Sequence, residues 1–200
     1  MEPQSLELLT ALLVGLGLSS ACGFRVFVPL LGASIAAHAG FLPLSPDFSW
    51  LGSTPALLAL SLATIIEIGA YSVPFIDHVL DAVTTPAAVI AGTLLMASQL
   101  GEVSPFLRWS LAVIAGGGAA GLMQAGSVLA RGATTMLTGG FGNLAIALLE
   151  FVGAVVMTLL SLFVPFLAAA GLFVVLLLMI SCIRSRGSKN NLTTPTAPPN

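Results

Sequence analysis

Apolar residues run through this chain in long unbroken stretches, separated by short polar or Pro/Gly-rich segments. The stretches cover residues 6–44, 55–75, 86–100, 107–130, 144–164 and 166–182. A helix needs about 20 apolar residues to cross the hydrocarbon core of a bilayer. The pattern therefore predicts an all-α fold: a polytopic transmembrane helical bundle of about six spans.

The first stretch, residues 6–44, is too long for one straight span. We expect it to bend, break or form a hairpin. Glycine and proline mark the places where a membrane helix can break. The candidate break points are Gly15, Gly17, Gly23 and Pro29.

The segment 138–143, Thr-Gly-Gly-Phe-Gly-Asn, interrupts the helical pattern between two stretches. Glycines let backbone carbonyls and amides approach a ligand closely, so Gly139, Gly140 and Gly142 could form a filter-like re-entrant loop that ends at Asn143. The alternative is a plain flexible turn between two spans.

Composition narrows the class of protein. The chain has 57% hydrophobic and 7% charged residues, whereas a soluble domain carries about 25% charged residues. The continuous apolar runs lack the alternating polarity of a transmembrane β-barrel. A net charge of −2 offers no basic surface for nucleic acid. Both cysteines lie in apolar runs and indicate neither a disulfide nor a metal cluster, and we expect no cofactor.

The two ends of the chain indicate orientation. The N-terminus is acidic, unlike the basic start of a secretory signal, so we expect the first stretch to be retained. Arg184, Arg186 and Lys189 follow the last stretch and place the C-terminus in the cytoplasm, for a protein of the cell (inner) membrane. Six spans would place the N-terminus there too. We expect residues 1–183 to form one transmembrane domain and the polar residues 184–200 to be a disordered cytoplasmic tail.

Residues 6–100 and 107–182 show a common order of features. Each half has a Gly-rich stretch leading to an arginine, then a span with one glutamate, then a Pro-x5-Gly span. Three spans per half would invert the second half, as in many transporters. The alternative is loose self-similarity of a Gly/Ala/Leu-rich chain, because arginine and glutamate are 42 residues apart in the first half and 19 in the second.

Charged residues inside or at the end of the apolar stretches are the strongest candidates for function. They are Arg25, Glu67, Arg131 and Glu150. Each would cost roughly 2.5–3.5 kcal/mol at the bilayer centre unless it is paired, neutralised or hydrated. We therefore predict that they gather at a site shielded from lipid. The glutamates could carry a proton or cation, and the arginines could pair with them or bind an anionic group. The alternative is a structural Arg–Glu pair that links helices.

A polar stripe follows Glu67 if the helix continues past it. On one continuous helix these residues share a face: Glu67, Tyr71, Pro74, His78, Asp81 and Thr85. Pro74 would kink that helix and free a carbonyl, as Pro29 could in the first stretch, so both are candidate gating positions. Alternatively, the helix ends near Phe75, and Asp77 and Asp81 lie in a solvated loop.

Asp77, His78 and Asp81 also form a candidate metal site. The two carboxylates are one helical turn apart and could hold a divalent metal through oxygen ligands. Membrane transferases that use such metals need more acids than this pair, and the sequence offers no second acidic cluster.

The segment 23–31, Gly-Phe-Arg-Val-Phe-Val-Pro-Leu-Leu, resembles a family of small bacterial integral membrane proteins known only as a domain of unknown function. The resemblance covers about residues 6–181. It continues through Glu67, Pro74-x2-Asp77-x3-Asp81, Pro86, Gly92, Thr-Gly-Gly-x-Gly-Asn at 138–143 and Glu150. The family often carries an Asp-Lys pair shortly after the glutamate, where this chain has Tyr71 and Ser72. The departure argues against a role that needs a second buried ion pair.

Three functions fit the sequence. The leading one is a transporter or channel for a small solute or ion with an intramembrane charged site. The second is a non-catalytic membrane scaffold or assembly protein with structural charges. The third is a metal-dependent lipid-modifying enzyme, although zinc-protease and nucleophile-elbow motifs are absent from the sequence. The expected partners are membrane lipids and the solute or ion, and a homo-oligomer is compatible with the sequence.

Overall fold

The computed structural model describes residues 3–70, 77–139 and 142–190, and nearly all of them are helical. The elements are α1 (Pro3–Cys22), α2 (Phe27–His38), the 3-10 helix η1 (Pro46–Gly52), α3 (Thr54–Ala70), α4 (Asp77–Gln99), α5 (Pro105–Leu111), the π-helix η2 (Ala112–Gly117), α6 (Gly118–Thr138), α7 (Asn143–Phe163) and α8 (Pro165–Asn190). The all-α prediction is confirmed.

Four helical segments of the described chain are long and apolar enough to cross a membrane. They are Ser5–Cys22, Asp81–Gln99, Pro105–Thr138 and Asn143–Phe163. The count rises to five if η1 and α3, which meet at 62°, form one bent span. The structure therefore supports a transmembrane bundle, but it does not confirm the predicted six spans.

The distribution of polarity is inside out compared with a protein in water. On α3 the outward residues Leu58, Leu62, Ile65 and Ile66 are at least 60% exposed. Charged side chains such as Arg131 and Glu150 lie in the interior. Contiguous apolar outer faces of this kind fit a lipid environment.

The first apolar stretch breaks between α1 and α2, as predicted, and the break includes Gly23. A side chain at Gly23 would meet Met123 and would lie only 2.5 Å from the Ala120 carbonyl and 2.8 Å from the Gln124 amide. Glycine is required here because the backbone passes directly against α6. Pro29 lies in the first turn of α2, where its missing amide hydrogen costs nothing.

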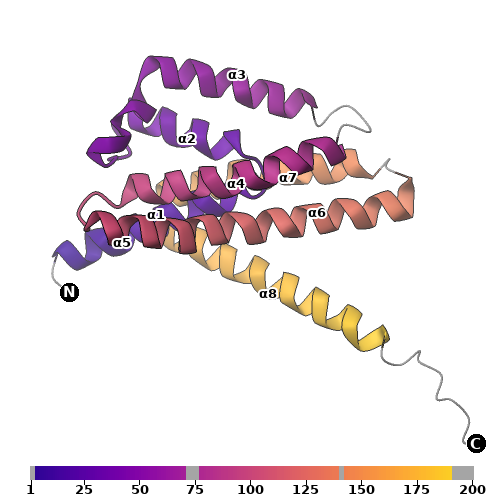
Figure 1. The fold of residues 1–200 in the computed structure, drawn as a ribbon. Coiled ribbons are helices and arrows are strands. Elements are labelled where there is room, and N and C mark those ends of the chain that lie inside the picture. Colours follow the sequence, from indigo (N-terminus) through magenta and orange to yellow (C-terminus); the bar gives the residue numbers. More distant parts are fainter. Residues whose placement is uncertain (1–2, 71–76, 140–141, 191–200) are drawn as a thin grey trace, which may run out of the picture.

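Helices α1 and α2 form a hairpin whose open end lies at one end of the bundle (Figure 1). Leu12 of α1 packs in a core with Phe48 of η1 and Leu100, which follows α4. At the same end, Ser34 of α2 donates to the carbonyl of Leu51 in η1 at 2.6 Å. The beginning of α1 and the end of α2 therefore share one end of the molecule, which we call the N-terminal face.

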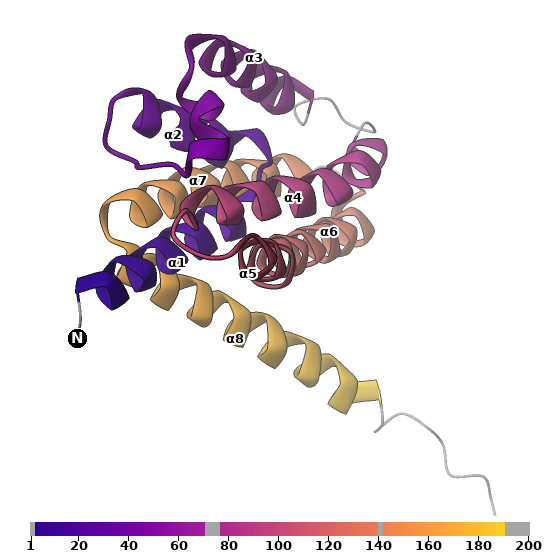
Figure 2. The same cartoon turned by 60° about the vertical axis from the view of Figure 1, so that its left-hand side comes forward.

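The remaining helices alternate in direction between the two ends. Figure 2 shows α2 and α3 as an outer layer over the group formed by α1, α4, α6 and α7. Helix α8 starts beside α1 and runs away from the bundle. Its core contact through Leu172 includes Ala21 of α1 and Met157 of α7.

Segments α5, η2 and α6 form one continuous helical stretch of 34 residues. Its π-helical turn presents Gly116 to Gly92 of α4, and a side chain at Gly116 would lie 2.7 Å from the Gly92 carbonyl. The hydroxyl of Ser19 in α1 donates to the same carbonyl at 2.7 Å. Small residues thus bring three helices into close packing.

Two sequence predictions need correction or stay unconfirmed. The polar stripe on one continuous helix is wrong, because α3 ends at Ala70 and α4 begins at Asp77 and runs in the opposite direction. Tyr71 and Pro74 lie outside the described residues. The inverted repeat is not confirmed, since Pro86 lies inside α4 whereas Pro165 begins α8.

Helix α8 continues to Asn190, so it crosses the predicted domain boundary at residue 183. Residues 191–200 of the predicted tail lie outside the described residues.

Candidate functional site: a buried cluster of charges

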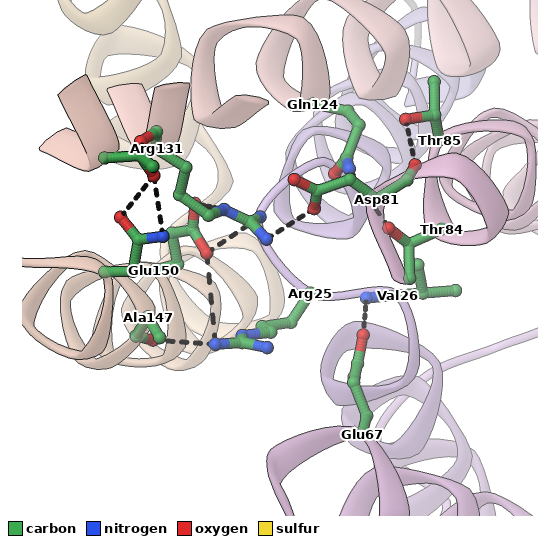
Figure 3. Close-up of polar contacts among 12 residues, drawn as sticks. Arg25, Val26, Glu67, Asp81, Thr84, Thr85, Gln124, Arg131, Ala147 and Glu150 are labelled. Atoms are coloured by element: carbon green, nitrogen blue, oxygen red, sulfur yellow. Dashed lines mark hydrogen bonds and ion pairs between the residues drawn. The ribbon is translucent and has the colours of Figure 1, made fainter. Parts of the chain in front are cut away.

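Five charged side chains from five parts of the fold meet in the interior (Figure 3). Asp81 comes from α4, Arg131 from α6, Glu150 from α7, Arg25 from the hairpin tip and Glu67 from α3. The first four follow one another as alternating charges, and we call Asp81, Arg131, Glu150 and Arg25 the charge chain. The prediction that the buried charges gather at one place thus describes the geometry well.

Arg131 and Glu150 form the centre of the charge chain. Nε of Arg131 donates to Oε1 of Glu150 at 3.1 Å, and Nη2 lies 3.1 Å from Oε2. The two side chains are only 2% and 5% exposed. The planar guanidinium presents two nitrogens to two carboxylate oxygens, which is the geometry that favours arginine over lysine in buried pairs.

Asp81 is the second carboxylate bound to Arg131. Its Oδ1 accepts a hydrogen bond from Nη1 of Arg131 at 2.5 Å, and its side chain is 13% exposed. The sequence indicated Asp81 as a metal ligand, a stripe residue or a loop residue, and missed this ion pair. Asp81 and Arg131 are 50 residues apart, so no local spacing could have revealed it.

Arg25 closes the other end of the charge chain at the hairpin tip. Its Nη2 donates to the backbone carbonyl of Ala147 at 2.9 Å and lies 3.9 Å from Oε2 of Glu150. The tip of the hairpin is therefore tied to α7, one turn before Glu150.

Glu67 binds the backbone of the hairpin rather than an arginine side chain. Its two oxygens accept the amide hydrogens of Val26 at 2.8 Å and Phe27 at 3.1 Å. These are the first amides of α2, and Val26 provides no side-chain cap of its own. A carboxylate at a helix N-terminus satisfies unpaired donors and interacts favourably with the helix dipole. Glu67 therefore works as a helix cap supplied from a different helix.

Polar residues on α6 extend the site beyond the charges. Gln124 donates to the hydroxyl of Thr84 on α4 at 3.3 Å, and Ser127 lies beside Glu150. Both are buried on the face of α6 that carries Arg131. Neither residue was among the predicted site residues, although Ser127 and Gln124 precede Arg131 by four and seven residues, a spacing that indicates one helical face.

Asn143 and the glycines near it form the connection between α6 and α7. The Asn143 side chain accepts from Thr134 at 2.8 Å and donates to Thr135 at 2.9 Å. Gly139 ends α6 in the left-handed conformation with φ 63°. The Gly142 amide donates to the Thr138 hydroxyl at 2.8 Å. These contacts fit the turn between two helices better than a filter. Gly140 lies outside the described residues.

The metal site stays a prediction. Asp81 binds Arg131 in this structure, and the side chains of Asp77 and His78 lie outside the described residues. Among the side chains that the structure describes, no group of three His, Cys, Asp or Glu residues could hold a metal ion.

The charge balance of the cluster limits its chemistry. Among the described side chains, the charge chain has two arginines and two carboxylates and is formally neutral, and Glu67 adds one carboxylate that binds backbone amides. Burying an unpaired charge is costly, whereas paired and hydrogen-bonded charges are tolerated in the interior. In the part of the chain that the structure describes, the charges of the chain satisfy one another in the interior.

An all-helical fold with apolar outer faces and a buried ionic site defines a helical integral membrane protein. The chain belongs to the family described as a domain of unknown function, DUF4126, whose model matches residues 12–185. No curated protein and no solved structure matches the chain.

Proposed function

We propose that this protein passes a small solute or ion across the membrane, with the charge chain and Glu67 as its site. The observation that carries the proposal is a buried row of alternating charges, which meets a broken helix at Arg25. The row begins at Asp81, its most exposed member, and leads inward to Arg25.

The cost of burial supports a role beyond packing. Replacing a buried ion pair by apolar residues of similar volume is often neutral or stabilising in proteins. A bundle that needed only cohesion would be served by apolar side chains at positions 131 and 150. Charged residues inside membrane helices mark ion paths and proton relays by default.

The broken hairpin supplies the second argument. Transporters commonly bind substrates where a membrane helix is interrupted, because the helix ends there offer backbone donors and acceptors. Here the amides of Val26 and Phe27 point at the Glu67 carboxylate, and Arg25 precedes them in the same turn. A change in the charge of Glu67 would alter how firmly the hairpin tip is held.

The test uses the purified full chain in liposomes, with flux measured for a panel of protons, monovalent cations, anions and small metabolites. We expect Glu150→Gln and Glu67→Gln each to reduce the wild-type flux by at least tenfold. The matched control is Glu102→Gln, which removes an exposed carboxylate outside the cluster. Wild-type flux equal to that of empty liposomes across the panel would reject the proposal.

A scaffold role is the second candidate, because each of the five charges already has a partner within the protein. It predicts that Arg131→Met combined with Glu150→Met folds normally and keeps the cellular phenotype of the wild type. Transport predicts loss of the phenotype in a double variant that folds normally.

A further inference from the structure

We propose that the α1–α2 hairpin is re-entrant, so that the two ends of the chain lie on opposite faces of the membrane, and that a small cation reaches the charge chain from the C-terminal face past Asp81. The statement about the cation rests on the proposed function, whereas the statement about the two faces does not.

The contacts of the hairpin fix its direction. Along α1, a side chain at Gly15 would meet Met96, and Ser19 binds Gly92 four residues earlier on α4, so α1 runs antiparallel to α4. Along α2, Phe24 before the helix lies near Gly153, and Gly32 packs against Thr158, so the chain returns along α7 toward the N-terminal face.

The depth of the tip follows from its partners on α7. Arg25 contacts Ala147 and Glu150, which lie near the start of the helix Asn143–Phe163. At 1.5 Å per residue, Glu150 is about 10 Å from Asn143 and about 20 Å from Phe163. The hairpin therefore inserts most of the way through the bundle from the N-terminal face and stops short of the other face.

The number of passes places the chain ends. Helices α1 and α2 start from the N-terminal face and return to it. The pair of α3 and α4 returns to it as well, as does the pair of α5/α6 and α7, and α8 then leaves it (Figure 1). The contact of Val175 with the core that includes Phe24 shows α8 already at the level of the hairpin tip. The C-terminus therefore emerges on the opposite face, which we call the C-terminal face.

Lysine and arginine identify the cytoplasmic side. Arg184, Arg186 and Lys189 follow one another near the end of α8, on the C-terminal face. The N-terminal face has Arg108, which binds Asp47 at 2.6 Å. By the positive-inside rule the C-terminal face is cytoplasmic, and the N-terminus is then outside. This differs from the sequence expectation that both ends are cytoplasmic, which depended on an even number of spans.

Access and charge select the ligand class. Asp81 is the most exposed member of the charge chain and lies on α4 only four residues after its first residue, Asp77, at the C-terminal face. Because the most exposed member of the charge chain is a carboxylate, a proton or another small cation is favoured over an anion. On the other side, the packed hairpin separates the site from the N-terminal face.

Cysteine labelling tests both parts on the full chain, in a background where Cys22 and Cys182 are replaced by alanine. Glu7→Cys, near the start of α1, marks the N-terminal face and Leu137→Cys the C-terminal face, since both positions are exposed. With a membrane-impermeant thiol reagent, we expect Glu7→Cys to react in right-side-out vesicles and Leu137→Cys in inverted vesicles. Reaction of both variants from the same side would overturn the assignment of opposite faces, whatever the flux assay shows.

Thr84→Cys tests access and charge, because Thr84 is buried beside Gln124, three residues or about one helical turn deeper along α4 than Asp81. We expect it to react from the C-terminal face. We also expect the ratio of its reaction rate with a cationic methanethiosulfonate to its rate with an anionic one to be at least five times the same ratio measured at Leu137→Cys. Three outcomes would overturn the access proposal: reaction from the N-terminal face, no reaction from either face, or equal normalised rates for the two reagents. A flux failure with the expected labelling would reject transport while leaving the topology in place.

Discussion

At the scale of single residues, Arg131 is the hub of the site, because it binds carboxylates from two other helices at once. Glu150 lies on the next helix in sequence and Asp81 on a helix 50 residues earlier. Removing the arginine would take a cationic partner from two carboxylates. Removing it together with Glu150 leaves Asp81, which is 13% exposed, and Arg25, which still donates to the Ala147 carbonyl.

We expect Arg131→Met to destabilise the fold by about 3–5 kcal/mol, the range for breaking a buried pair on one side. The double variant Arg131→Met/Glu150→Met should recover a large part of that loss. Thermal unfolding in one detergent measures both, and Arg108→Met, at a more exposed ion pair, is the control with an expected loss of about 0–1 kcal/mol. A double variant as unstable as the single one would show that the pair does not act as a unit.

Glu67 acts on a different target, the backbone of the hairpin tip. Glu67→Gln keeps one acceptor oxygen but loses the charge that favours the N-terminus of α2, an interaction of up to about 2 kcal/mol in a partly buried site. We expect amide hydrogen exchange at Val26 and Phe27 to accelerate by about tenfold. The control is again Glu102→Gln, and unchanged exchange at these two amides would contradict the capping role.

At the scale of elements, glycines decide how closely helices approach. A side chain at Gly92 of α4 would lie 2.6 Å from the Ala120 side chain and 2.9 Å from the Gly116 carbonyl. Both neighbours belong to the continuous stretch that contains the π-helical turn, so α4 and this stretch would have to separate.

We therefore expect Gly92→Ala to lower the free energy of unfolding by about 1–3 kcal/mol, as overpacking does elsewhere. Gly132→Ala is the matched control on α6, because nothing lies within 4 Å of a side chain added there. It should be neutral or raise stability by up to about 1 kcal/mol, since alanine favours helix. Equal effects of the two substitutions in chemical or thermal unfolding would rule out close packing at Gly92.

The elements also show what the sequence could and could not predict. Apolar run length predicted the helices and the break at Gly23, because both are local properties of the chain. The hairpin, the cap from Glu67 and the pairing of Asp81 depend on partners 40 or more residues away. Periodicity carries no information about which helices become neighbours. Pairing with an arginine was one of two roles predicted for Glu67, and the structure instead gives it the backbone amides of Val26 and Phe27 at the broken helix.

At the scale of the whole molecule, the two tryptophans of the chain lie at the same end of the bundle. Trp50 of η1 and Trp109 of α5 lie at the N-terminal face and are 53% and 46% exposed. Trp109 also contacts Phe48, with ring centroids 6.3 Å apart. Tryptophan favours the boundary between headgroups and hydrocarbon.

We expect lipids brominated near the headgroup to quench the tryptophan fluorescence more strongly than lipids brominated near the chain end. The variants Trp50→Phe and Trp109→Phe allow each ring to be measured alone, and both should give the same shallow depth. Strongest quenching from the deep bromine position for either ring would contradict the placement of η1 and α5 at the membrane surface.

The long reach of the hairpin tip has a consequence for biosynthesis. Arg25 binds Ala147, which the ribosome adds 122 residues later, so the tip is synthesised well before α7 exists. Until then its guanidinium lacks that carbonyl and the nearby Glu150 carboxylate. A nascent chain cut short before residue 147 would therefore leave the hairpin tip without its partners on α7.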